Sequence, residues 1–292
     1  AGAAPPTRRD VPEPDDVREV GLPVGPVLDR GVVDRGERGV RHGAGVGPGA
    51  AGPSTRGLTT GNRHYSCQPR AATSVRRVDG GSSGLRSAWD DVATTYAALL
   101  PDMRAEAPLD LSVLSAFGQL ARGAASGPVV EVGCGAGRVM AHLADQDLEM
   151  VGIDLSTSMV AAARLAHPTL PLAAGDAAAL PFRTGALGGL VSWYSLINTP
   201  TAALPEVLDG FARVTAAGAP LLLAFQSGEG ERVDRASAYG RRISMTYFLH
   251  RAETVRAAVV DAGFSLYATV NREPALRHET TTQSFVLAVR AV

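Results

Sequence analysis

A strand that runs directly into a glycine turn constrains this sequence more than any other feature. Residues 128–139 read PVVEVGCGAGRV, with Gly133, Gly135 and Gly137 at every second position after an apolar stretch. Glycine allows a sharp turn and lets a ligand touch the main chain. The helix predicted to follow points its free N–H groups toward the same place. The segment therefore predicts a cofactor site at the end of a strand.

Strand and helix patterns alternate through the rest of the chain. PVVEVG, LEMVGID, LPLAAGD, ALGGLVSWY and APLLLAFQ are strand-like, and helical patterns such as STSMVAAARLAH separate most of them. Near the end, FSLYATVNRE and TTQSFVLAVRAV follow one another with no helix between them. We expect a Rossmann-like doubly wound α/β sheet, mostly parallel, with an antiparallel C-terminal strand pair.

The first 77 residues have a different character from the remainder. Gly, Pro and Arg recur there without a period, and Tyr65 is the only aromatic residue. Such a segment buries too little apolar area to offset the entropy of folding. We therefore expect residues 1–77 to be disordered or not part of the native protein, with Val78 as an alternative start, and residues 78–292 to form one folded domain.

Charge, cysteine and apolar patterns exclude several classes of protein. The formal net charge is −1, which does not indicate a nucleic-acid partner. No apolar run approaches the length of a membrane span, and no signal pattern begins the chain. Cys67 and Cys134 are read as free thiols, and the histidines are too scattered for a metal cluster. The expected location is cytoplasmic, with no metal and no membrane partner.

The spacing of the glycines narrows the choice of cofactor. A dinucleotide fingerprint requires a glycine three residues after Gly135, where this chain has Arg138. Glu131 precedes the turn and suits a ligand with positive charge better than a pyrophosphate. A phosphate-binding loop is also excluded, because the chain contains no lysine.

The segments EVGCGAG, VGIDLS and GDAAALPF, in this order, resemble those of the class I S-adenosylmethionine-dependent methyltransferases. The resemblance spans about Leu85 to the C-terminus. It implies a sheet of about seven strands with one antiparallel, and S-adenosyl-L-methionine as the cofactor. The acid common in the family before the fourth strand is replaced here by Gly188 and Gly189.

The resemblance also implies roles for individual residues. Asp154 would bind the ribose hydroxyls, although an Asp at this place also caps helices well, as Ser156 would. Asp176 and Ala177 would bind adenine, with Leu155 and Met159 packed against the base. Tyr96 would reach the methionine carboxylate or be a core aromatic. The remaining expected cofactor contacts are Glu131, Gly133, Cys134, Gly135, Gly137 and the region of Ser192.

The acceptor pocket is expected from the segments after the fourth and fifth strands. Aromatic and polar residues there suit a small acceptor, and we expect Trp193, Tyr194, Asn198 and Tyr247 to line the pocket. His250 is the candidate base, with a structural histidine as the alternative reading.

The predicted function is methyl transfer to an O or N atom of a small molecule by in-line displacement. The alternatives are an NAD(P)-dependent reductase and a non-catalytic S-adenosylmethionine-binding protein. We expect the protein to be a monomer or a homodimer.

Overall fold

The computed structural model describes residues 81–124 and 127–292. The expectations about residues 1–77, and about Cys67 and Val78, concern positions outside the described residues. None of the helices in the described ranges is long and apolar enough to cross a bilayer.

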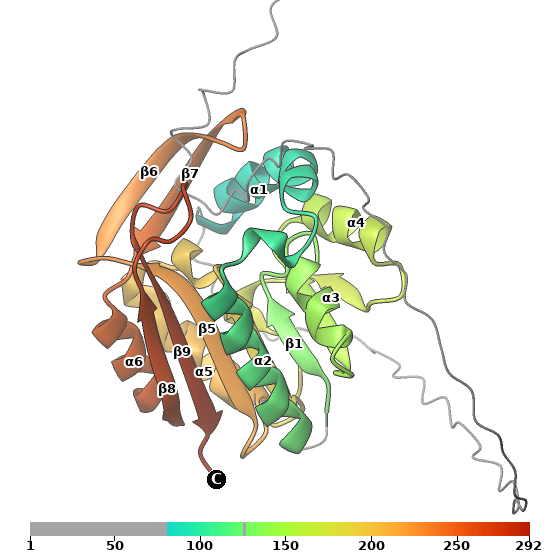
Figure 1. Ribbon diagram of the computed structural model, residues 1–292, viewed down its shortest axis with the longest axis vertical. Coiled ribbons are helices and arrows are strands. Elements are labelled where there is room, and N and C mark those ends of the chain that lie inside the picture. The colour runs from blue at the N-terminus through green and yellow to red at the C-terminus, as the bar shows by residue number, and fades with distance from the viewer. Residues whose placement is uncertain (1–80, 125–126) are drawn as a thin grey trace, which may run out of the picture. The chain divides into compact units, whose positions relative to one another are not determined.

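A seven-stranded sheet forms the centre of the fold, in the order β3-β2-β1-β4-β5-β9-β8 (Figure 1). Its strands are β1 (Val129–Val132), β2 (Met150–Asp154), β3 (Leu172–Ala174), β4 (Gly189–Trp193), β5 (Pro220–Ser227), β8 (Phe264–Arg272) and β9 (Thr282–Arg290). The first five pair in parallel, and β9 pairs antiparallel with both β5 and β8. The predicted fold class, including the antiparallel C-terminal pair, is confirmed.

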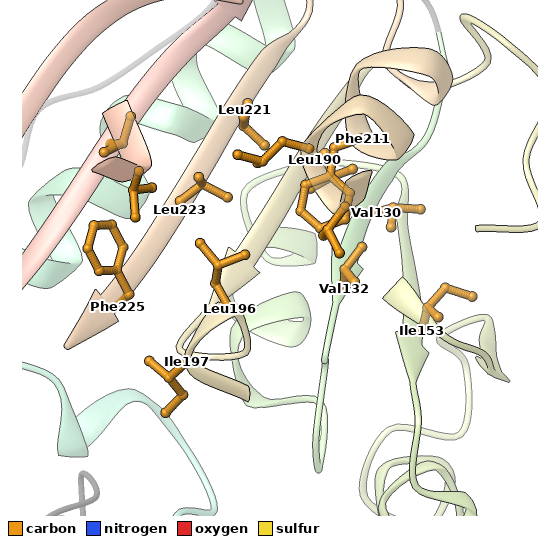
Figure 2. Close-up of a cluster of buried hydrophobic side chains, with 14 of the residues drawn as sticks. Val130, Val132, Ile153, Leu190, Leu196, Ile197, Phe211, Leu221, Leu223 and Phe225 are labelled. Carbon is orange, nitrogen blue, oxygen red and sulfur yellow. The ribbon is translucent and has the colours of Figure 1, made fainter. Parts of the chain in front are cut away.

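Helices cover both faces of this sheet. They are α1 (Gly81–Leu99), α2 (Pro108–Gly123), α3 (Arg138–Ala144), α4 (Thr157–Ala166), α5 (Leu204–Val214) and α6 (Ala252–Asp261). One buried cluster joins the sheet to α2 and α3, and a second joins it to α5, α6 and α1. Figure 2 shows Leu190 of the sheet beside Phe211 of α5 in this second cluster, to which Leu223 also belongs. Because the central strands are buried on both faces, their sequences are almost continuously apolar.

Residues 227–250, which we expect from the sequence to be a long connection after the fifth strand, instead contain a two-stranded hairpin. Strand β6 (Glu231–Ala238) pairs antiparallel with β7 (Arg241–Leu249) as a separate sheet. Tyr239 and Gly240 form the turn with φ values of 51° and 72°. Positive φ at both positions is typical of a tight hairpin turn, but a tyrosine adopts it at a cost. The hairpin contacts α1, so the buried ring of Tyr239 offsets this cost.

Candidate functional site

The glycine turn lies where β1 ends, as predicted. Gly133, Gly135 and Gly137 have φ values of 76°, 53° and 88°, a region that favours glycine. A Cβ atom on Gly133 would lie 2.2 Å from the Cβ of Ser195, and one on Gly135 would lie 3.4 Å from the Tyr96 ring. The turn therefore needs glycine both for its conformation and for close packing.

Glu131 is a buried acid, and one of its carboxylate oxygens lacks a hydrogen-bond partner in the described residues. Its side chain is 2% exposed, and Oε2 has no hydrogen-bond partner within the described residues. Burial raises the pKa of Glu131 to about 8, against the opposing effect of Arg138. A buried polar atom without a partner is costly unless a ligand satisfies it. An ammonium group would do so and would also favour the ionised carboxylate.

Asp154 ends β2 beside the glycine turn. Its Oδ2 accepts a hydrogen bond from the Gly135 backbone N–H at 2.7 Å, and its Oδ1 accepts one from the Ser156 N–H at 2.8 Å. Ser156 caps α4 by accepting from the Met159 N–H at 3.0 Å. Capping therefore falls to Ser156. The Asp154 oxygens keep lone pairs for further donors, as two ribose hydroxyls would require.

The residues expected around adenine lie after β2 and β3. Asp176 is half-buried, and its Oδ1 accepts from the Ala178 N–H at 3.0 Å, which caps the short helix η3 (Ala177–Ala179). Leu155 is half-buried beside Asp154 in sequence, whereas Met159 is 1% exposed and belongs to the core. Packing against a base is thus easier to assign to Leu155 than to Met159.

An aromatic trio covers the glycine turn. Tyr96 of α1 meets Trp89 edge-on at 5.9 Å and Tyr239 edge-on at 5.2 Å between ring centroids. Arg138 lies close enough to Tyr96 to act electrostatically on its hydroxyl, and it forms a buried ion pair with Glu106. Asp90, also on α1, accepts from the Ser156 hydroxyl at 2.6 Å and from the Ser158 N–H at 2.9 Å, which ties the helix to the loop after β2. Trp89, Glu106 and Arg138 were not predicted as site residues.

The end of β4 brings several expected residues to the same edge of the sheet. Ser192 is buried, with its hydroxyl 2.7 Å from that of Ser195, which in turn donates to the Val132 carbonyl. Trp193 Nε1 and Asn198 Oδ1 are buried, and neither has a hydrogen-bond partner in the described residues. The Trp193 and Tyr194 rings meet edge-on at 5.6 Å, and Tyr194 has a φ of 54°. Unsatisfied polar atoms beside aromatic rings are what an acceptor pocket requires.

His250 and Tyr247 are placed differently from this group. His250 is fully buried; its Nε2 lies 3.2 Å from the Leu196 carbonyl and its Nδ1 3.2 Å from the Thr201 hydroxyl. Burial lowers the pKa of His250. With both ring nitrogens engaged, the geometry supports the structural reading over that of a base. The Tyr247 hydroxyl accepts from Arg235 at 2.9 Å within the β6–β7 hairpin.

Cys134 and the histidines of the described residues are not arranged for metal binding, and Cys134 is not poised as a nucleophile. Cys134 is buried, and burial raises the pKa of its thiol well above the usual range. Within residues 81–124 and 127–292, no group of three or more His, Cys, Asp or Glu side chains is arranged to hold a metal ion.

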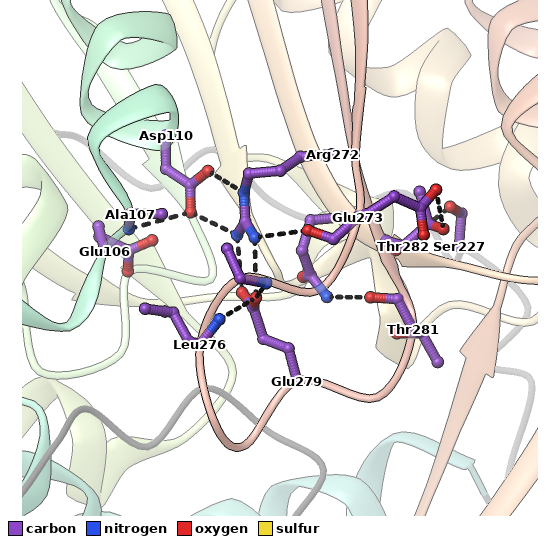
Figure 3. Close-up of polar contacts among 12 residues, drawn as sticks. Glu106, Ala107, Asp110, Ser227, Arg272, Glu273, Leu276, Glu279, Thr281 and Thr282 are labelled. Carbon is purple, nitrogen blue, oxygen red and sulfur yellow. Dashed lines mark hydrogen bonds and ion pairs between the residues drawn. The ribbon is translucent and has the colours of Figure 1, made fainter.

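A second charged cluster stands close to the β4 end. Arg272 donates to Asp110 of α2 at 2.8 and 2.9 Å and to Glu279 at 2.8 and 2.6 Å (Figure 3). Burial raises the pKa of Asp110, and Arg272 opposes that effect. In this cluster the arginine satisfies both carboxylates, so its role is structural.

The fold is that of a Rossmann-like α/β protein, and the acid-bearing glycine turn lies at the end of its first strand, where proteins of this fold bind their ligands. Residues 129–218 match the sequence model of a family described as a methyltransferase domain. A demethylmenaquinone methyltransferase of Beutenbergia cavernae is 37% identical over 98 residues, 33% of this chain and 39% of that protein. Its counterpart from Renibacterium salmoninarum is 31% identical over 151 residues, 48% of this chain and 62% of that protein. The matches thus cover less than two thirds of these relatives.

Solved structures share the fold at low sequence identity. A methyltransferase of Methanosarcina mazei has a TM-score of 0.52 at 15% identity, covering 59% of this chain and 96% of that one. The [4+2]-cyclase SpnF has a TM-score of 0.55 at 16% identity, covering 73% and 98%. The family match over residues 129–218 and the strand order support a class I S-adenosylmethionine-dependent methyltransferase, whose cofactor, S-adenosyl-L-methionine, fits the turn described above.

Proposed function

We propose that the chain transfers the methyl group of S-adenosylmethionine to a small molecule by in-line displacement. When bound, the sulfonium supplies an already activated methyl group. The observation that carries the proposal is the partnerless Oε2 of buried Glu131 beside the glycine turn. The reductase alternative is less favoured, because Glu131 suits a pyrophosphate poorly and residues 129–218 match a methyltransferase domain.

The residues of the site then have distinct tasks. Glu131 holds the ammonium group, Asp154 the ribose hydroxyls, and Asp176 with the Ala177 N–H the adenine edge. Tyr96 covers the methionine end from α1, together with Trp89. The remaining expected contacts, Gly133, Cys134, Gly135, Gly137, Leu155, Met159 and Ser192, supply main chain and packing around these groups.

The acceptor side lies at the end of β4. Trp193 and Tyr194 offer aromatic surface, and Trp193 Nε1 and Asn198 Oδ1 offer one donor and one acceptor to a ligand. We also place Tyr247 on the acceptor side, because its strand, β7, contacts the segment around Asn198. The curated relatives are named for a quinone, so an aromatic ring bearing oxygen is our first choice of acceptor. Methylation of an O or N atom remains our proposal, with a location in the cytoplasm and a monomer or homodimer as the working unit.

A second candidate is a cofactor-binding protein without methyl transfer. It is favoured by the burial of His250, whose two ring nitrogens are both engaged. The same fold also occurs in a protein named as a cyclase.

Two measurements test these proposals. Calorimetry with S-adenosylmethionine, S-adenosylhomocysteine and NADH should show uptake of the first two only. Mass spectrometry with a methyl-labelled cofactor and a panel of naphthohydroquinones, phenols and amines should reveal a labelled product. Uptake without any product would favour the non-catalytic candidate, and no uptake by a folded protein would remove both.

A further inference from the structure

Buried polar atoms without partners are concentrated in the proposed site. In the described part of the chain there are four such side-chain atoms: Glu131 Oε2, Trp193 Nε1, Asn198 Oδ1 and His278 Nε2. The first three lie at the carboxyl ends of β1 and β4, where the cofactor and acceptor are proposed to bind. The fourth belongs to a residue with no assigned role.

The loop that carries His278 is held firmly beside the start of α2. Residues 273–281 join β8 to β9, and Arg272 clamps this loop by binding both Glu279 and Asp110 (Figure 3). Glu279 also accepts from two backbone N–H groups of the loop, at 2.7 and 2.9 Å. His278 directly precedes Glu279, so a rigid scaffold positions its ring.

His278 and the β4 end share their surroundings. Glu106, Arg272 and Glu279 act electrostatically on both His278 and Tyr194. Trp193, the neighbour of Tyr194, packs on Phe285 of β9 at 5.5 Å between ring centroids. Strand β9 begins directly after the loop. His278 and Tyr194 therefore lie near the same charged residues, and one of these, Glu106, pairs with Arg138, which acts in turn on Tyr96.

We propose that His278 Nε2 is the base that takes the proton of an acceptor hydroxyl or phenol. The inference rests on the proposed function. The hydroxyl oxygen forms a bond to the methyl carbon, the bond from that carbon to sulfur breaks, and sulfur keeps the electron pair. The proton passes from oxygen to Nε2. The indole N–H of Trp193 is a suitable donor to the same ligand.

The protonation state of His278 suits this task. Burial lowers the pKa of His278. The negative charges of Glu279 and Glu106 oppose this effect, and the positive charge of Arg272 reinforces it. The ring is therefore neutral at pH 7 and able to accept a proton. Tyr194, whose pKa burial raises well above its usual value, stays protonated beside the same charges.

The test compares His278→Gln with His142→Gln. His142 is a matched control, since it is half-buried on α3 and its Nε2 lies 3.1 Å from Gln146. With a phenolic acceptor, His278→Gln should lower kcat/KM by roughly 100-fold or more and remove the acidic limb of its pH profile. The control should stay within about 3-fold of the unmodified protein. Binding of S-adenosylmethionine, measured by calorimetry, should be the same in all three proteins.

A second readout does not depend on turnover. Histidine side-chain NMR is recorded with S-adenosylhomocysteine, before and after addition of 1,4-naphthohydroquinone. The His278 nitrogen signal should shift on addition, and that shifting signal should be missing from His278→Gln. No shift, or an unchanged pH profile in the variant, would overturn the role of His278. If the unmodified protein did not bind S-adenosylmethionine, the proposed function itself would be overturned.

Discussion

Replacing Glu131 with Gln tests how the buried acid is linked to the cofactor. The pKa of Glu131 is about 8 because the carboxyl is buried without full hydrogen bonding. At pH 7 the group is therefore mostly protonated in the free protein. Binding of an ammonium group favours the ionised form, so the proton must leave when the cofactor binds.

The size of this effect follows from the pKa. Compared with the Kd of a protein in which Glu131 is fully ionised, the Kd for S-adenosylmethionine should be about 10-fold higher at pH 7 and about 100-fold higher at pH 6. Above roughly pH 8 the α-amino group of the ligand loses its own proton, so affinity should peak near pH 8. About 0.9 proton should be released per binding event at pH 7.

Calorimetry in buffers of different ionisation enthalpy measures both the Kd and the released proton. In Glu131→Gln, the proton release should vanish and the Kd should become flat between about pH 6 and pH 7.5. If the unmodified protein released no proton, or if the variant kept the same pH dependence, the assigned role of Glu131 would be refuted.

The stability of the free protein gives an independent check. The folded state keeps the Glu131 proton up to about pH 8, whereas the unfolded chain loses it near pH 4.5. This contribution to the free energy of unfolding is complete below pH 4.5 and is lost as pH rises toward 8, by up to roughly 5 kcal/mol. Glu131→Gln should therefore match the unmodified protein at pH 4 and be the more stable of the two at pH 9, in urea unfolding.

Three further substitutions test other parts of the site. Asp154→Ala should raise the Kd for S-adenosylmethionine about 5- to 150-fold by calorimetry, through loss of charged hydrogen bonds, whereas exposed Asp209→Ala should not. Gly133→Ala should lower the free energy of unfolding by several kcal/mol (~2–4), since its Cβ would overlap Ser195 at a φ of 76°; an unchanged urea midpoint would contradict this. Arg272→Met should cost about 3–5 kcal/mol by leaving two buried carboxylates unpaired, whereas Arg232→Met, in an ion pair with both side chains 65% exposed, should leave the free energy of unfolding almost unchanged.

The fold could be predicted because its signals are local. Apolar strands such as Val129–Val132, buried on both faces, and the glycine turn after them are visible in short windows of sequence. The same is true of Ser156, a typical helix cap directly after Asp154. The β6–β7 hairpin was missed because β6 is mostly polar and the turn is Tyr-Gly, without the Asn or Asp usual in such turns.

Site residues could be predicted only where they lie within a single sequence motif. The positions of Glu131 and Asp154 follow from strand ends, so sequence spacing was sufficient for them. The cover of the glycine turn combines Tyr96 with Tyr239, which are 143 residues apart in the chain. Nothing in the local sequence distinguishes His278 from His250. Only the folded structure shows that both ring nitrogens of His250 have hydrogen-bond partners, whereas His278 Nε2 has none in the described residues.

The way each buried charge is satisfied separates structural groups from ligand-binding groups in this protein. Asp110 and Glu279 lie deep beside α2, yet Arg272 and backbone N–H groups supply their hydrogen bonds. Glu131 is as buried as Asp110 and has a free oxygen. Each unsatisfied atom costs about 1–3 kcal/mol in the free protein, and a ligand that pairs with it recovers that energy on binding. The instability at the ends of β1 and β4 is therefore the source of affinity for whatever fills the site.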